Sequence, residues 1–146
     1  MKISIGSDHR GHAQRKFIAD SIAKLGHEVD DLGSHSQESS DYPDIAVQVA
    51  TQVASGATDR GVLICGTGIG MSMAANKIDG IRAALCCDVE AAKLSRQHND
   101  ANVLCLAGND FDETQAAEIL KIWLSTEFEG GRHARRVEKI QKLESR

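Results

Sequence analysis

Residues 60–70 read RGVLICGTGIG, an apolar run that passes directly into alternating glycines. A short apolar run bounded by glycine is typical of a strand that is buried on both faces of a parallel sheet. Glycines that follow such a strand and precede a helix-length segment, here residues 69–78, favour a tight strand-to-helix turn. This stretch therefore predicts an α/β protein built on a buried parallel sheet.

Segments of the same two kinds alternate on both sides of this stretch. We expect strands at 2–6, 28–32, 60–65, 81–87 and 102–107, and helices at 11–25, 43–55, 69–78, 88–98, 112–127 and 132–145. This alternation of strands and helices predicts a three-layer, doubly wound five-stranded parallel sheet (Rossmann- or flavodoxin-like) plus a C-terminal helix. We expect the strand order 2-1-3-4-5, a single domain over residues 1–146, and the greatest mobility in the polar loop 33–41.

The composition limits the partners and the compartment. The net charge of −4 gives no general attraction to nucleic acid or to an anionic membrane, so we expect neither as a partner. No apolar run approaches the roughly 18 residues of a membrane-spanning helix, and the first residues do not resemble a secretory signal. Cys65, Cys86, Cys87 and Cys105 form no C-x-x-C pair, which disfavours a disulfide framework or a zinc site. We expect a cytoplasmic protein without a bound metal.

The glycine-rich turn is the first candidate for chemistry, because ligands of open α/β sheets bind beyond the carboxyl ends of the strands. Cys65 stands at the mouth of this turn, and the first strand ends in Ser7-Asp8-His9. Main-chain N–H groups of such a turn can stabilise an anion, and a helix N-terminus favours a thiolate. A base beside an anion cradle suits proton abstraction next to a carbonyl. An equally open alternative is that the glycines only make a turn and that Cys65 is one more core cysteine.

A dinucleotide site is a further alternative, with Asp88 as the ribose-binding acid. The G-x-G-x-x-G pattern fails at its third glycine, which is Met71, and the motif follows the third strand rather than the first. We therefore expect no cofactor.

Two further groups of polar residues follow. Arg132 and Arg136 are four residues apart, so they share one helix face and could bind a phosphate, although exposed arginines on a helix are common without any ligand. His98 ends the fourth predicted helix, where it could cap the helix or transfer protons near neutral pH.

Taken together, several segments resemble the ribose-5-phosphate isomerase B family, which includes galactose-6-phosphate isomerase subunits. The resemblance covers nearly the whole chain. It rests on Ser7-Asp8-His9, Asp41-Tyr42-Pro43-Asp44, Cys65-Gly66-Thr67-Gly68-Ile69-Gly70, His98-Asn99-Asp100-Ala101-Asn102 and Gly131-Arg132-His133-Ala134-Arg135-Arg136. It implies an aldose–ketose isomerase that works through a cis-enediol without metal or cofactor, as a homodimer or as a dimer of dimers.

The resemblance also implies a role for each matched residue. Cys65 would be the base, Thr67 would move protons between the substrate oxygens O1 and O2, and His98 would help to open the sugar ring. Substrate would be bound by the main chain of Gly66, Gly68, Ile69 and Gly70, by Asn99 at the enediolate, by Asp8 and Tyr42 at the sugar hydroxyls, and by His9, Arg132 and Arg136 at the phosphate. Some relatives carry a glutamate base in the glycine-rich loop; here Gly70-Met71-Ser72 offers no acid.

Two consequences remain open. His98 and Asn99 precede the fifth strand, whereas Cys65 ends the third, so one subunit cannot bring them together and we expect a site shared between subunits. The family commonly has an arginine where this chain has Asn109, and the chain's Arg10 could replace its charge. The substrate could therefore be a six-carbon phosphate of allose or galactose, or the protein could bind sugar phosphates without catalysis.

Overall fold

The computed structural model describes residues 1–33 and 41–144. The strands are β1 (Lys2–Ser7), β2 (Glu28–Asp31), β3 (Arg60–Cys65), β4 (Ala83–Leu85) and β5 (Val103–Ala107). The helices are α1 (His12–Lys24), α2 (Tyr42–Ala54), α3 (Ile69–Ala75), α4 (Val89–Asn99), α5 (Glu113–Ser125) and α6 (Arg132–Gln141), and a 3-10 turn, η1 (His9–Gly11), precedes α1. All strand pairs are parallel, which confirms the predicted fold class. Most of the predicted polar loop, residues 34–40, lies outside the described residues.

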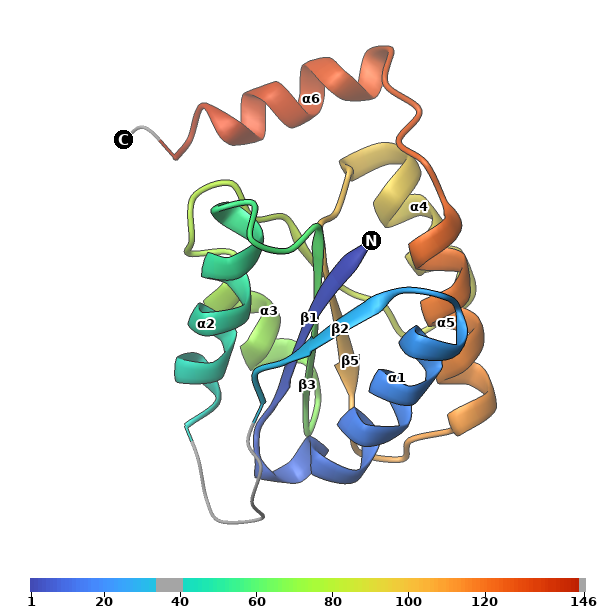
Figure 1. Cartoon of the computed structure of the whole chain (residues 1–146). Coiled ribbons are helices and arrows are strands. Elements are labelled where there is room, and N and C mark those ends of the chain that lie inside the picture. Colours follow the sequence, from blue (N-terminus) through green and yellow to red (C-terminus); the bar gives the residue numbers. More distant parts are fainter. Residues whose placement is uncertain (34–40, 145–146) are drawn as a thin grey trace.

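Helices cover both faces of the sheet (Figure 1). α1, α4 and α5 lie on one face, and α2 and α3 lie on the other. Successive residues of a strand point to opposite faces, so β3 contributes Val62 and Ile64 to the first core and Leu63 and Cys65 to the second. This alternation directs Cys65 toward the same face as α3, the helix that follows it.

The predicted strand order is wrong at one edge of the sheet. The observed order is β2-β1-β3-β5-β4, so β5 lies between β3 and β4. The first four residues of β5 are fully buried, whereas all of β4 is only half-buried. Arg82, just before β4, directs its guanidinium to Asp100 and to main-chain carbonyls. An edge position accommodates that charge, and the uninterrupted apolar run 103–107 suits the centre of a sheet covered on both faces.

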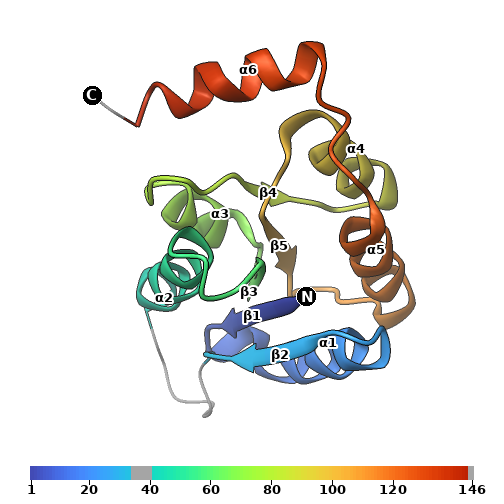
Figure 2. The same ribbon diagram turned by 45° about the horizontal axis from the view of Figure 1, so that its top comes forward.

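Helix α6 runs across the end of the sheet at which the strands begin (Figures 1 and 2). It packs on α4 and buries His133 and Val137, whereas Ile140 is 43% and Leu143, beyond its end, is 56% exposed. A groove of about 750 Å³ lies between these two residues and the segment 76–84. The described helices include none that is long and apolar enough to cross a membrane.

Candidate active site

A cavity of about 790 Å³ opens at the carboxyl ends of β1 and β3. Its walls are the loop after β1, the first turn of α2, and the glycine-rich loop between β3 and α3. The predicted residues that line it are Asp8, His9, Tyr42, Cys65, Gly66, Thr67, Ile69 and Gly70. The structure therefore brings residues from three distant segments of the sequence to one site, at the edge of the sheet where a ligand was expected.

The thiol of Cys65 lies deep in this cavity and is 5% exposed. The main-chain N–H of Gly68 donates a hydrogen bond of 3.2 Å to its sulfur. Gly68 itself has φ +76°, and a Cβ there would lie 2.5 Å from the Leu85 side chain and 3.1 Å from the carbonyl of Leu106. Only glycine fits this position without strain. The turn therefore holds a main-chain N–H donor against the sulfur.

Cys65 differs from the two other buried cysteines. Burial raises the pKa of Cys86 to about 11, and burial also raises the pKa of Cys105. Neither side chain lines the cavity of Cys65. Cys65 therefore belongs to the second core, as Cys105 does, and in addition faces a cavity and a main-chain donor.

Neighbouring side chains fix the rest of the glycine-rich loop. Thr67 is exposed at the mouth of the cavity, and its hydroxyl oxygen accepts a 3.2 Å hydrogen bond from the N–H of Ile69. The ring of Tyr42, at the start of α2, lies directly over Gly70, where a Cβ would come within 2.5 Å of the ring. Gly70 thus lets α2 and α3 begin side by side, and Tyr42 forms one wall of the cavity.

Asp8 is buried at the end of β1, and its carboxylate accepts hydrogen bonds from the N–H groups of Arg10 (3.0 Å) and Gly11 (3.2 Å). It therefore caps the η1 turn as well as lining the cavity. Beside it, His9 is half-buried and also faces the cavity.

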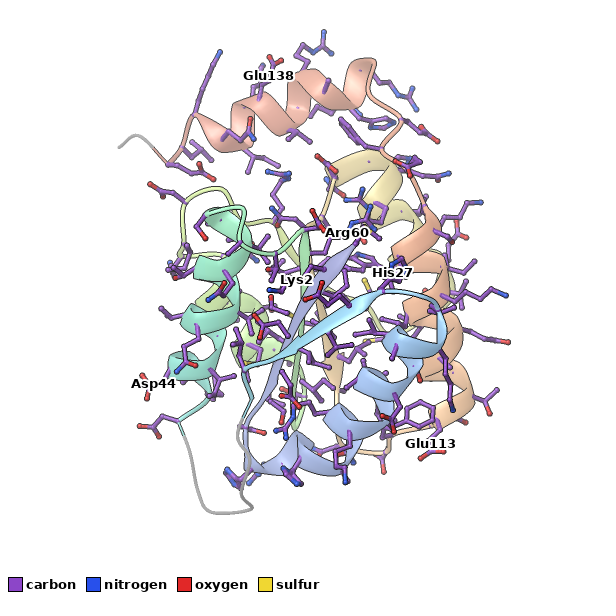
Figure 3. All side chains as sticks on the ribbon, viewed as in Figure 1. Lys2, His27, Asp44, Arg60, Glu113 and Glu138 are labelled. Carbon is purple, nitrogen blue, oxygen red and sulfur yellow. The ribbon has the colours of Figure 1, made fainter. Side chains whose placement is uncertain are left out.

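The remaining predicted residues, His98, Asn99, Arg132 and Arg136, lie at the other end of the molecule. They belong to the end of α4 and the start of α6, beside the amino ends of the strands. In Figure 3, Glu138 on α6 is labelled at the top of the view and Asp44, which lines the cavity, at the lower left. Within one chain the two groups therefore lie at opposite ends of the strands.

His133 belongs to this second group and was not singled out from the sequence. Its ring stacks on that of His98, with centroids 4.2 Å apart and an interplanar angle of 14°. Its Nε2 lies 3.5 Å from a carboxylate oxygen of Glu129. Burial lowers the pKa of His133, and the nearby His98 and Arg132 lower it further. Its position in the predicted motif, between Arg132 and Arg135, could have drawn attention to the residue, although not to its contact with His98.

These three side chains, His98, Glu129 and His133, have potential metal ligand atoms within 4.8 Å of one another. An ion bound by an imidazole lies in the plane of the ring. Two nearly parallel rings whose centroids are 4.2 Å apart cannot both direct a nitrogen at one ion in their planes. The arrangement therefore does not fit a shared metal.

The dinucleotide interpretation is also disfavoured by the structure. Asp88 accepts a 2.7 Å hydrogen bond from the N–H of Ala91 and so caps α4. Met71, at the position of the missing third glycine, belongs to α3 and is fully buried in the second core.

Comparisons with known proteins agree with this geometry. The profile of the family described as Ribose/Galactose Isomerase matches residues 3–140. Ribose-5-phosphate isomerase B of Escherichia coli (strain K12) is 48% identical over 99% of this chain and 97% of its own length. The structure of the Clostridium thermocellum ribose-5-phosphate isomerase B superposes with a TM-score of 0.97 at 52% identity, covering 99% of this chain and 98% of that one. The Mycoplasma genitalium ribose-5-phosphate isomerase B, solved with bound ribulose-5-phosphate, gives a TM-score of 0.95 at 42% identity, covering 99% and 96%. The chain belongs to the ribose/galactose isomerase family.

Proposed function

We propose that this protein interconverts ribose 5-phosphate and ribulose 5-phosphate through a cis-enediolate, with Cys65 as the base. The observation that carries the proposal is the sulfur of Cys65, which lines the cavity and accepts the N–H of Gly68 at 3.2 Å. The names of the Escherichia coli and Clostridium thermocellum relatives support the reaction, and the ribulose-5-phosphate of the Mycoplasma genitalium structure supports the class of substrate.

In the proposed reaction the Cys65 thiolate removes the proton from C2 of the open-chain aldose. The electrons of that bond form the enediolate, whose negative charge lies on O1. The hydroxyl of Thr67 carries a proton from O2 to O1, and Cys65 returns its proton to C1, which leaves a ketone at C2 and a free thiolate. The N–H groups of Gly68 and Ile69 already bind Cys65 and Thr67, so we assign the enediolate oxygens to the other N–H groups of the loop.

The proposal includes a homodimer, because the groups for ring opening and phosphate binding lie far from Cys65 within one subunit. His98 would open the ring, Asn99 would assist at the enediolate, and Arg132 and Arg136 would bind the phosphate of a substrate held by the partner. The groove at α6, which exposed Ile140 and Leu143 line, supports such an association, since contiguous exposed apolar surface marks interaction sites.

A six-carbon sugar phosphate is the second candidate substrate. Asn109 favours it, because family members commonly carry an arginine at this place. Without the positive charge of that arginine, the site should favour a different position of the phosphate group, and therefore a sugar of a different length. An isomerase assay with ribose, allose and galactose phosphates decides between the two.

Solvent isotope exchange tests the chemistry itself. In deuterated water the protein should label the substrate at C1 or C2, and Cys65→Ala should abolish the labelling. Cys87→Ala, which removes an exposed cysteine outside the cavity, is the matched control and should label at the rate of the unmodified protein. A protein that only binds sugar phosphates would produce no label in any form, and full exchange by Cys65→Ala would exclude Cys65 as the base.

A further inference from the structure

Arg10 lies beside the glycine-rich loop. The η1 turn, capped by Asp8, directs the Arg10 side chain over Gly66. If residue 66 carried a Cβ, that atom would lie 3.4 Å from both the Cδ and the Nη1 of Arg10. The side-chain amide nitrogen of Asn109 lies 3.3 Å from the same Cβ position of residue 66. Asn109 is held there by its own N–H, which donates to the Gly66 carbonyl at 2.9 Å. Arg10 and Asn109 therefore meet at Gly66, from two different loops.

The charges around this place are unbalanced. In the described part of the chain, Arg10 is the one lysine or arginine that lines the cavity, whereas Asp8, Asp41 and Asp44 also line it.

Other arginines of the chain have carboxylate partners: Arg15, Arg82 and Arg96 each lie 3.2 Å or less from a carboxylate oxygen. Arg10 forms no ion pair with any residue that the structure describes. Its guanidinium is available to an anion that enters the cavity.

We propose that Arg10 is a substrate-binding residue of this chain, and that its guanidinium, together with the Asn109 amide, binds the phosphate group of the sugar phosphate. The proposal rests on the proposed function for the identity of the substrate. A guanidinium presents a planar fork of donors that matches two phosphate oxygens, and an amide N–H can donate to a third. The pair would supply, inside the subunit that carries Cys65, part of the positive charge that a dianionic substrate needs.

The phosphate is a better partner for Arg10 than the enediolate. The enediolate oxygens are already assigned to main-chain N–H groups of the loop that follows Cys65. Arg10 instead approaches this loop at Gly66, beside the Asn109 amide. A residue that binds a non-reacting phosphate contributes equally to the ground state and the transition state, so its loss raises KM and leaves kcat nearly unchanged.

Steady-state kinetics of Arg10→Ala test this expectation. KM should rise about ten- to a hundredfold, the effect of losing a charge-assisted hydrogen bond, while kcat stays within about twofold. Arg10→Lys keeps the charge but not the fork and should recover part of the loss. Arg10→Ala combined with Asn109→Arg returns a guanidinium to the same point and should recover more. Lys93→Ala, an exposed cation on α4, should leave both constants unchanged.

Two outcomes would overturn the proposal. An unchanged KM in Arg10→Ala means that the phosphate does not contact Arg10, and a fall in kcat at constant KM means that Arg10 acts on the reacting carbons instead. Binding of inorganic phosphate to Cys65→Ala protein, with and without Arg10→Ala, separates this result from the proposed reaction, because it requires no turnover. Phosphate binding that weakens without Arg10 in a protein that fails every isomerase assay would support the anion site and contradict the reaction.

Discussion

The two ends of this molecule hold the two groups of predicted site residues in very different ways. At the carboxyl ends of the strands, Cys65 and Asp8 are buried and receive main-chain hydrogen bonds from the turn beside them. At the other end, Asn99, Arg132 and Arg136 are exposed, and Leu143 is 56% exposed beside an open groove. The first group is ordered by the fold of its own chain. The second is largely exposed, which is what the proposed shared site requires of residues that complete a site in another subunit.

Subunit complementation gives the largest effect and tests this difference directly. Cys65→Ala and His98→Ala homodimers should each be nearly inactive, by a factor of roughly 10²–10⁴ for loss of a proton-transfer group. A heterodimer of the two restores one complete site, composed of Cys65 from one subunit and His98 from the other. Activity should therefore return to about half that of the unmodified dimer, as measured in purified, differently tagged heterodimers.

Heterodimers of Cys65→Ala with the double variant Cys65→Ala, His98→Ala serve as the control, since they contain no Cys65 thiol and should stay inactive. If proven heterodimers of the two single variants remain inactive as well, both ends serve a site within one subunit by some rearrangement, and the comparison above fails.

Glycine substitutions sharpen the contrast in how tightly each end is packed. Gly68 at the cavity and Gly56 at the opposite end, between α2 and β3, have nearly equal φ angles of +76° and +78°. A Cβ on Gly68 would come within 2.5 Å of Leu85, whereas one on Gly56 would have no described atom within 4 Å. Gly56→Ala should cost roughly 1–2 kcal/mol of unfolding free energy, from backbone strain alone. Gly68→Ala should cost about 1–3 kcal/mol more, from overpacking.

Urea denaturation followed by circular dichroism measures both losses. Equal losses would mean that the glycine-rich turn relaxes freely around a side chain. In that case the loop could not hold the Gly68 N–H at the Cys65 sulfur as the structure has it.

Much of this architecture could be predicted from the sequence, because it depends on local signals. The apolar run of β3 and the glycines after it located the cavity. The positions of β4 and β5 in the sheet could not be predicted in the same way, because both segments are apolar. Their order depends on a tertiary feature, namely that β4 lies at the edge of the sheet and leaves room there for the Arg82 guanidinium. The stacking of His133 on His98 was equally inaccessible, since it joins α6 to α4 across 35 residues of sequence.

The smallest expected effect concerns the pH dependence of stability at the α4–α6 end. The pKa of His133 is lowered by its burial and then by the charges of His98 and Arg132. An unfolded histidine, with a pKa of about 6.5, binds a proton before His133 does in the folded protein as the pH falls. As the pH falls through that value, the unfolded state takes up more protons than the folded state, and the stability decreases. Above it both states are neutral and the contribution disappears.

Thermal unfolding between pH 7.5 and pH 5.5 checks this sign. The Tm should fall with pH, and His133→Gln should flatten the dependence even if it lowers the Tm at every pH. Glu129→Gln should steepen it, because the Glu129 carboxylate opposes the lowering of the His133 pKa. A dependence that is unchanged in both variants would mean that the stacked pair does not resist protonation. The α4–α6 end would then be looser in solution than its packing indicates, and a partner subunit would have to order it to a greater extent.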